Sequence, residues 1–254
     1  MTIFFLQAFF LYPCLYAQSA RQSEQDYINY TTDPDAPKVV GSGEPVAERR
    51  EITVPFNAVT VGNGMQLFIV SGEAKSIEVV AQAEILPLIR SDVADNRLTV
   101  GLTASLETSK GIKIYVSVGN LSEIKVKEGG YLFLPEQVEM DSLKMLLQSG
   151  ASADCAVFSK TFSCTVMGGS TLRLSGKVPD SAIIAVLGGS ELKGKNFKCL
   201  DCDVTVLGAS KCWITAQQTL KARVENESKL LYYGYPKTVQ KMTKLNGRIS
   251  HRVR

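Results

Sequence analysis

The sequence has 254 residues, of which 45% are apolar and 21% are charged, and its formal net charge is +3. This composition excludes an intrinsically disordered chain and is sufficient for the core of one domain or of two small ones. The net charge is small, and no compact run of Lys and Arg is interleaved with aromatic residues, so we expect no nucleic acid as a partner.

Residues 1–17 form an uncharged, mostly apolar stretch that is typical of a secretory signal peptide. Pro13 interrupts this stretch, which is also too short for a spanning helix. We therefore predict a signal peptide over residues 1–17, with cleavage after Ala17 and export of the mature chain. Lipidation of Cys14 is the alternative, although Pro13 stands where a lipoprotein signal has a small residue. No second apolar run reaches spanning length, so we expect no integral membrane segment in the mature chain.

Residues 18–48 are polar, contain three prolines and two glycines, and show almost no apolar periodicity. They predict a flexible leader. From residue 49 onward, short segments rich in β-branched and aromatic residues alternate apolar with polar positions, and Gly, Asn, Asp and Ser separate them. The one helix-like stretch, residues 83–93, contains Pro87. We therefore predict an all-β domain over residues 49–254.

A turn triplet recurs through the second half of the chain at steps of 18 or 20 residues. Such a period is typical of a solenoid, in which each repeat must stack on its neighbours to bury its apolar face. The first residue is Gly or Asn, which tolerate a left-handed backbone. The copies are Gly150-Ala151-Ser152, Gly168-Gly169-Ser170, Gly188-Gly189-Ser190, Gly208-Ala209-Ser210, and the degenerate Asn226-Glu227-Ser228 and Asn246-Gly247-Arg248.

The flanks of the triplets alternate with period two. Before the third complete copy, for example, Val186 and Ile184 are apolar, whereas Thr165 and Arg173 are examples of polar positions that would point to the other side. Stacked about 4.8 Å apart, such coils enclose an apolar interior. A seven-stranded sandwich would also alternate, but it has no reason to repeat one turn at constant spacing. The pattern predicts a parallel β-helix with coils of about 20 residues.

Several segments together resemble the head GIN domain family, the putative auto-transporter adhesins found mainly in Bacteroidetes. They are "GSGEPVAERREITVPFNAVTV", "MQLFIVSGEAKSIEVVA", "IKIYVSVGNLSEIKVKEGG", the Gly-Ala/Gly-Ser coils and "SKLLYYGYPKTVQKMTKLNGRIS". The resemblance runs from about Gly41 to Ser250. It implies a right-handed single-stranded β-helix, located in the periplasm, at the outer-membrane surface or outside the cell. The family supplies no catalytic residues. The Asn-led turns at Asn226 and Asn246 depart from its Gly-led pattern.

Candidate catalytic and metal-binding residues are few. His251 is the only histidine and lies near the C-terminal end, so it cannot complete a nucleophile-His-acid arrangement within the predicted core. No zinc-protease, P-loop or dinucleotide motif is present. We therefore expect no catalytic, metal or cofactor site, and a protein that is not an enzyme.

Five cysteines follow the predicted cleavage point. Cys164, Cys202 and Cys212 occupy predicted inward positions, which indicates packing as small apolar groups. One disulfide between adjacent coils is the alternative in an exported chain. Cys199 and Cys202 have the spacing of a zinc or redox half-site, but a second ligand pair and a strand-to-helix junction are both missing.

Three further groups have alternative interpretations. Asp201 and Asp203 could be an outward calcium pair of the kind used by polysaccharide lyases, or two solvated carboxylates. The group Tyr232, Tyr233, Tyr235 and Pro236 could stack on a sugar, or pack near the last coil.

The third group is the basic end. After Glu227 the chain carries seven cations and no carboxylate: Lys229, Lys237, Lys241, Lys244, Arg248, Arg252 and Arg254. A solvated, partly frayed terminus is one interpretation. We further interpret residues 237–254 first as a cationic cap of the solenoid and second as a contact for anionic envelope glycans.

These observations predict an exported, non-catalytic β-helix protein of the adhesin type that binds a surface, glycan or protein partner. A structural cell-envelope scaffold without its own ligand is the first alternative. A carbohydrate-active β-helix enzyme is the second, and a cluster of carboxylates in a groove would favour it.

Overall fold

The computed structural model describes residues 38–72, 76–108, 111–135 and 138–253. The chain divides into two units, residues 1–31 and 32–254, and every described element belongs to the second. The predicted signal peptide and most of the predicted leader lie outside the described residues. The elements are β1 (Val39–Val40), β2 (Val46–Glu51), β3 (Ala58–Val61), β4 (Gln66–Ser71), β5 (Ser76–Ala81), the 3-10 turn η1 (Leu86–Leu88), β6 (Ile89–Ala94), β7 (Arg97–Leu102), β8 (Leu106–Thr108), β9 (Lys113–Val118), β10 (Glu123–Val126), β11 (Tyr131–Leu134), β12 (Glu139–Leu147), β13 (Ser152–Met167), β14 (Thr171–Leu187), β15 (Glu191–Leu207), β16 (Lys211–Glu225), β17 (Lys229–Tyr233), β18 (Thr238–Lys244) and β19 (Arg248–His251).

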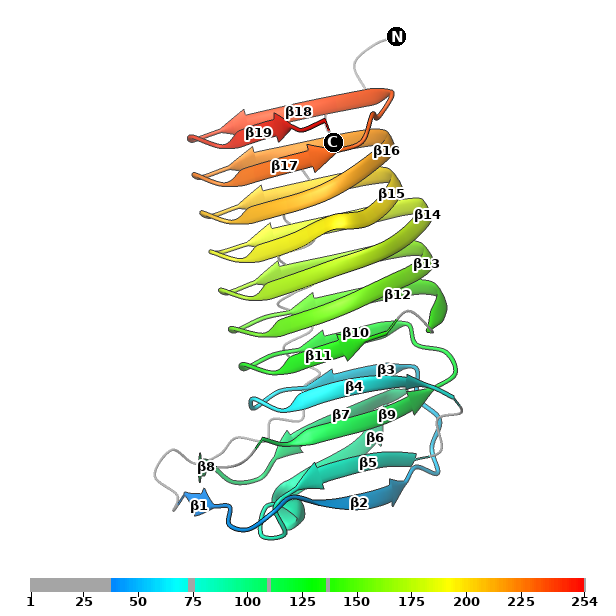
Figure 1. Cartoon of the computed structure of the whole chain (residues 1–254), viewed down its shortest axis with the longest axis vertical. Helices are drawn as coiled ribbons and strands as arrows, with labels where there is room; N and C mark the ends of the chain where they lie inside the picture. Colours follow the sequence, from blue (N-terminus) through cyan, green and yellow to red (C-terminus); the bar gives the residue numbers. More distant parts are fainter. Residues whose placement is uncertain (1–37, 73–75, 109–110, 136–137, 254) are drawn as a thin grey trace. The chain divides into compact units, whose positions relative to one another are not determined.

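The strands stack as the coils of a parallel β-solenoid (Figure 1). One wall is formed by β7, β3, β10, β12, the second halves of β13 to β16, and β18. The other wall is formed by β9, β4, β11, the first halves of β13 to β16, β17 and β19. Each strand pairs with its neighbours in the next coils, which confirms the predicted parallel β-helix.

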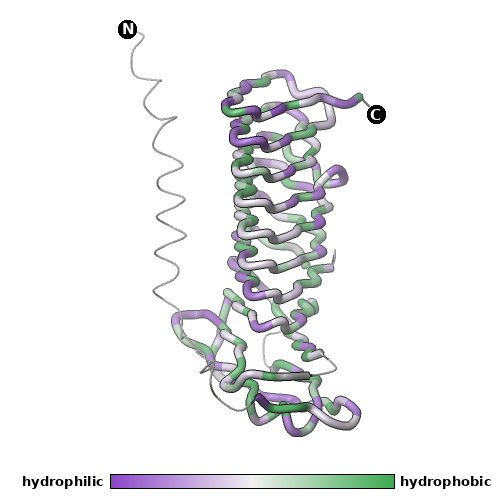
Figure 2. The backbone as a smooth tube through the Cα atoms, turned by 90° about the vertical axis from the view of Figure 1, so that its left-hand side faces the viewer, coloured by the Kyte–Doolittle hydropathy of each residue, from purple (hydrophilic) through white to green (hydrophobic). Residues whose placement is uncertain are grey.

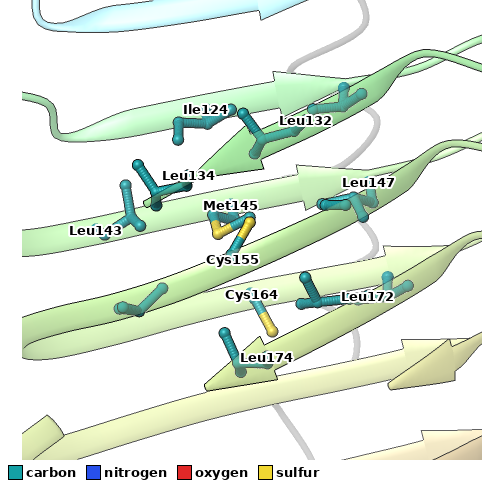
Figure 3. Packing of buried hydrophobic residues seen from close by; sticks show 14 of the residues in the cluster. Ile124, Leu132, Leu134, Leu143, Met145, Leu147, Cys155, Cys164, Leu172 and Leu174 are labelled. Carbon is teal, nitrogen blue, oxygen red and sulfur yellow. The ribbon is translucent and has the colours of Figure 1, made fainter. Parts of the chain in front are cut away.

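The interior is filled by the apolar positions of the period-two pattern. Cys155 and Leu174 are partners in adjacent coils, as are Phe162 and Ala182, and all four are buried. Figure 3 shows Cys155 and Leu174 among the apolar side chains that lie between the two walls in successive coils. Figure 2 shows the same stacking as a series of superimposed rungs along the backbone. The alternation of the sequence therefore produces an apolar interior that runs from coil to coil.

Two consecutive residues adopt a left-handed backbone at each sharp corner, as in a type I′ turn. Gly168, Gly188 and Gly208 have φ values of 64°, 60° and 68°, as their role in the predicted corner requires. The predicted register is off by one residue at the first and last copies, where the left-handed pairs are Ser149–Gly150 and Leu245–Asn246. Gly150 N–H donates to Gly168 O, just as Gly169 N–H donates to Gly188 O in the next coil. Gly150 is therefore equivalent to Gly169, and Ser149 is equivalent to Gly168.

The third turn position is serine in four successive coils, and these serines form a buried ladder. The backbone N–H of Ser170 donates to Ser190 Oγ at 3.2 Å, Ser190 N–H donates to Ser210 Oγ at 3.2 Å, and Ser210 N–H donates to Ser228 Oγ at 3.1 Å. The hydroxyl of Ser210 in turn donates to Leu207 O at 2.8 Å. The repeated serine therefore satisfies buried backbone groups that the turn would otherwise leave unpaired.

The N-terminal end of the solenoid is not a plain continuation of the coils. β2 pairs antiparallel with β5, β5 with β9, and β6 with β7. The β-helix predicted over residues 49–254 is therefore corrected at its N-terminal end, because parallel coils begin only with β7 and β9. The strands β1 and β2 also begin inside the range expected as a flexible leader. Within the described ranges, no helical segment has the length and apolar character needed to cross a membrane.

The basic C-terminal end is an ordered coil, because β18 pairs with β16 and β19 pairs with β17. The frayed interpretation is wrong for residues 238–251. Among the inward positions of this coil, Val239 and Ile249 are the apolar register partners of Leu220 and Leu230, and Ile249 packs against the core. Lys241, Thr243 and His251 take the positions that follow Ala222, Val224 and Tyr232. Polar side chains thus replace part of the apolar stack at this end, as suits a terminal repeat of a solenoid. Arg254 lies outside the described residues.

Candidate functional site

The outward side chains of the wall formed by β9, β4, β11, β17, β19 and the first halves of β13 to β16 form what we call the downstream face. Its strands β9, β4, β11 and β17 are in the foreground of Figure 1. The outward positions at the centre of successive strands form one column. In register, this column reads Tyr115, Phe68, Phe133, Asp154, Arg173, Lys193, Trp213 and Leu231.

A pocket of about 530 Å³ opens on the downstream face across five coils, from β13 to β17. Its aromatic walls are Trp213 and Tyr233, and Arg173, Lys193 and Lys195 contribute the cations. The remaining lining residues are Asp154, Leu174, Ser175, Glu191 and Asn196. An aromatic wall with a few polar groups beside it is the usual composition of a small-ligand site.

A bulge in β15 builds one side of the pocket. Gly194 pairs with Ile214 and Lys198 with the next residue, Thr215, so residues 195–197 have no partners in β16. Phe197 is fully buried and its ring lies 5.5 Å from that of Phe162, so it anchors the bulge in the core. The hydroxyl of Thr215 donates to Lys195 O at 2.6 Å and fixes the bulge from the neighbouring coil.

Gly194 allows β15 to lie close to the backbone of Trp213 in the next coil because it has no side chain. A Cβ at Gly194 would lie 2.8 Å from Trp213 O, closer than real Cβ contacts occur. The Lys195 side chain then lies over the Tyr233 ring, with its ammonium 5.2 Å from the ring centroid. This cation–π contact holds a positive charge beside the aromatic wall.

The charges in the pocket are mixed but predominantly positive. Glu191 pairs with Lys193 at 3.1 Å. Asp154 is the register partner of Arg173. Burial and the charge of Asp154 raise the pKa of Tyr131, and Arg173 partly offsets this effect. The pocket thus holds three cations and two carboxylates, so an anionic group would meet a net positive charge there.

A cluster of aromatic side chains, which we call the aromatic patch, continues the same face beyond Asp154. Phe68 stacks on Tyr115 with 4.9 Å between ring centroids, and its ring lies 6.4 Å from Tyr131 and 6.2 Å from Phe133. Phe133 is 40% exposed. Since Phe133 is the register partner of Asp154, the patch and the pocket are parts of one surface.

The tyrosine group is divided between the last coil, the pocket and the surface. Tyr232 is buried, stacks on His251 at 4.6 Å and has the Lys241 ammonium 4.9 Å from its ring, which is the capping role. Tyr233, the next residue, points to the opposite side and lines the pocket. Tyr235 is 71% exposed and touches the edge of His251.

The carboxylates Asp201 and Asp203 do not form a calcium site in this structure. Both lie on the wall opposite the downstream face, paired in register with Thr219 and Lys221 of the next coil. Burial raises the pKa of Asp203, and the charge of Lys221 only partly opposes this effect. The Asp203 carboxyl is therefore a poorer cation ligand than an ordinary aspartate. Among the described residues, no three His, Cys, Asp or Glu side chains gather in a way that could hold a metal ion.

The cysteines are divided between two environments. Cys155, Cys164 and Cys212 are buried free thiols, and burial raises the pKa of each. Packing as small apolar groups is thus confirmed for Cys164 and Cys212. Cys202 instead forms a disulfide with Cys199, with 6.0 Å between the Cα atoms. The bond closes a corner within one coil, so the expectation of a disulfide between adjacent coils is wrong.

Trp213 and the bulge residues were not identified by the sequence reasoning. One signal was present, because the only tryptophan of the chain falls on an outward position of a regular coil, where the repeats otherwise place polar residues. Residues 195–197, which have no partners in β16, carry no comparable sequence signal, because they lie in a segment where the coil length varies.

The comparisons with known proteins bear on the fold. The family model "Putative auto-transporter adhesin, head GIN domain" matches residues 55–236. A putative adhesin from Bacteroides fragilis has a similar structure, with a TM-score of 0.76 and 17% identity over 84% of this chain and 100% of that chain. A putative adhesin from Parabacteroides merdae gives a TM-score of 0.70 and 18% identity over 85% and 100% of the two chains.

A third solved structure carries a different description. A Parabacteroides distasonis protein described as a putative lipid binding protein gives a TM-score of 0.66 and 14% identity over 85% of this chain and 100% of that chain. No curated protein matches the chain. At these identities the structures show the shared fold, and the family model covers more than half of the sequence. The chain belongs to the head GIN domain family of putative auto-transporter adhesins.

Proposed function

We propose that the protein is an exported, non-catalytic β-helix of the adhesin type that binds a glycan through the pocket on its downstream face. Within the partner classes predicted from the sequence, which were a surface, a glycan or a protein, the pocket favours the glycan. Export, to the periplasm, the outer-membrane surface or the exterior, is proposed on the apolar stretch of residues 1–17 and on the family.

The observation that carries the proposal is the outward Trp213 beside Tyr233, with charged and amide groups around both rings. An aromatic ring packs against the apolar face of a sugar, while hydroxyl groups need polar partners at its rim. Arg173, Lys195 and Asn196 line the same pocket and supply such partners. Trp213 is the one aromatic side chain of this pocket that is partly exposed, whereas Tyr233 is buried beneath Lys195.

Two alternatives lead to different expectations. A structural envelope scaffold needs no ligand, so loss of Trp213 would leave its interactions unchanged. A carbohydrate-active enzyme would need two free carboxylates, whereas the two in this pocket are Glu191, ion-paired with Lys193, and Asp154, beside Arg173 in the ladder. We expect no cleavage of a bound glycan when its reducing ends are measured.

The test is a glycan array probed with the mature chain and with Trp213→Ala. We expect the wild type to bind a defined set of glycans and the variant to lose at least about tenfold in affinity for them. The matched control is Ile183→Ala, because Ile183 is 40% exposed on the opposite wall and lies outside the pocket. Binding that Trp213→Ala retains in full would contradict the proposed function.

A further inference from the structure

Resting on the proposed function, we infer that the ligand is a linear, negatively charged polysaccharide that lies along the solenoid axis, and that the aromatic patch is a second subsite for it. The pocket holds one part of the chain, at Trp213 and Tyr233. The patch, at Phe68, Tyr115, Tyr131 and Phe133, holds another part several coils away.

The downstream face carries an excess of positive charge. Exposed cations follow its outward positions along most of its length, whereas its carboxylates are two and only partly exposed. The cations are Lys113, Arg173, Lys193, Lys195, Lys211, Lys229 and Arg248, and the carboxylates are Asp154 and Glu191. A face of this kind attracts a polyanion.

The opposite wall is less biased. Its outward positions carry the carboxylates Glu123, Asp201, Asp203 and Glu225 and the cations Arg97, Lys125, Lys144, Lys221, Arg223 and Lys244. Several of these are ion-paired with one another, as Glu123 is with Lys144 and Glu225 with Arg223. The excess of positive charge is therefore larger on the downstream face, where the described residues include seven cations and two carboxylates.

The spacing of the two aromatic sites also supports an extended ligand. Phe133 and Trp213 belong to the same column and are separated by four coils, which is about 19 Å at the usual distance between strands. Asp154, Arg173 and Lys193 lie between them in that column, two cations and one carboxylate. One pyranose residue of an extended chain is close in length to one coil spacing. A chain that stacks on both aromatic sites therefore passes over Asp154 beside the patch and places its acidic groups nearer the pocket over Arg173 and Lys193.

The aromatic patch is partly exposed to solvent. The Phe133 side chain is 40% exposed and is not packed in the apolar interior. Clustered exposed rings mark binding surfaces more often than they stabilise a fold. Their alignment with the pocket in one column indicates that both bind the same ligand.

The experiment uses oligomannuronates from the disaccharide to the octasaccharide, with mannan oligosaccharides of the same linkage and length as the uncharged control. Affinity is measured by calorimetry for the wild type, Trp213→Ala and Phe133→Ala. We expect affinity to rise with length until both sites are spanned, and to fall with added salt. Phe133→Ala should lower affinity about tenfold for the octasaccharide and leave the disaccharide unchanged.

Three results would overturn the inference. They are equal affinity for the neutral series, affinity independent of length, or no binding of any oligomannuronate. If Trp213→Ala still loses its glycans on the array in any of these cases, the proposed function stands and only the extended anionic ligand is wrong. If Trp213→Ala loses nothing on the array, the proposed function itself fails. Circular dichroism of each variant, with Ile183→Ala as reference, separates loss of binding from loss of fold.

Discussion

Serine occupies the same buried turn position in four successive coils, and each hydroxyl has a definite partner. Ser190 Oγ accepts from Ser170 N–H, so replacing that hydroxyl leaves a buried donor without an acceptor. The cost of such an unsatisfied group exceeds the small net value of an ordinary hydrogen bond. The ladder therefore ties the corners of adjacent coils together at single atoms.

We expect Ser190→Ala to lower the free energy of unfolding by about 1–2 kcal/mol, measured by urea denaturation. The matched control is Ser181→Ala in the same strand, where the side chain is exposed and little change is expected. Equal stability of Ser190→Ala and the wild type would show that the ladder is a consequence of the fold and not a contribution to it.

The glycines at the corners have a different role from the serines. A Cβ at Gly188 would lie 3.6 Å from Gly168 N, an ordinary contact, so the backbone angle rather than space selects glycine there. We expect Gly188→Val to cost more than about 1 kcal/mol in thermal or urea unfolding. Gly188→Asn should cost less, because Asn226 and Asn246 adopt φ values of 54° and 63° in equivalent turns. A valine variant as stable as the asparagine variant would contradict this explanation.

At the scale of the elements, one ion-pair network connects coils that are not neighbours. Glu123 in β10 pairs with Arg97 of β7, although β3 lies between them. Ala58, the register partner of both residues, is small enough to let the guanidinium cross the intervening strand. Lys125 and Lys144 lie 3.7 Å from the other carboxylate oxygen.

This network makes stability depend on pH. Burial alone would raise the pKa of Glu123, but the Arg97 hydrogen bond and the charges of Arg97, Lys125 and Lys144 lower it. A lowered folded pKa stabilises the protein above the ordinary value of 4.5, and this contribution is lost as the pH falls through the folded value. We expect Glu123→Gln to be less stable at neutral pH by less than about 1 kcal/mol, because the pair is partly solvated.

The difference between Glu123→Gln and the wild type should begin to shrink below pH 4.5, where the carboxylate of the unfolded chain becomes protonated, and should be lost as the pH falls through the lowered pKa of the folded protein. Urea titrations at several pH values measure it, with Glu78→Gln at an exposed position as the control. A difference that stays constant from neutral to acidic pH would exclude the carboxylate charge as its cause.

Much of the coil structure could be predicted because the period-two alternation and the repeated turn are both local in the sequence. Cys164, Cys202 and Val204 each stand between polar residues, and their inward orientation follows from strand geometry. The direction of a strand leaves no such trace in the sequence. The antiparallel pairing of β2 and β6 could therefore not be foreseen.

The site was harder to predict than the coils. Tyr233 was singled out within a tyrosine-rich segment, but the pocket also needs the bulge at residues 195–197. A bulge depends on how two neighbouring coils differ in length, which is a property of the pair and not of either segment. The off-register first turn has the same origin, since Ser149 takes a left-handed backbone that its residue type does not favour.

For the whole molecule, the two ends of the solenoid differ. The N-terminal end is covered by antiparallel strands, whereas β18 and β19 each pair on one side only with a preceding coil. Unpaired strand edges invite pairing with another chain unless charge prevents it. Lys241, Lys244, Arg248 and Arg252 place that charge on or next to the last coil.

We expect neutralising these four residues to glutamine to promote self-association, measured by sedimentation velocity. A matched variant that neutralises Arg49, Arg90, Lys177 and Lys198, all exposed away from the last coil, loses the same charge and should stay in the wild-type state. If both variants associate alike, net charge and not the cap explains solubility. A terminal variant that keeps the wild-type state, with weaker binding of oligomannuronate, would favour the recognition role instead.

The position of β3 and β4 in the stack has a consequence for the order in which the chain can fold. These strands come early in the sequence, yet they lie between β7 and β9 on one side and β10 and β11 on the other. The ladders on the two sides of β3 and β4 form only after two later segments have been placed beside them. Each of these pairings closes a long loop. From β12 onward each coil needs only the coil before it, so ordering can spread one coil at a time. The C-terminal half can therefore add coils by short-range closure, while the N-terminal end depends on contacts between distant segments and sets the slower step.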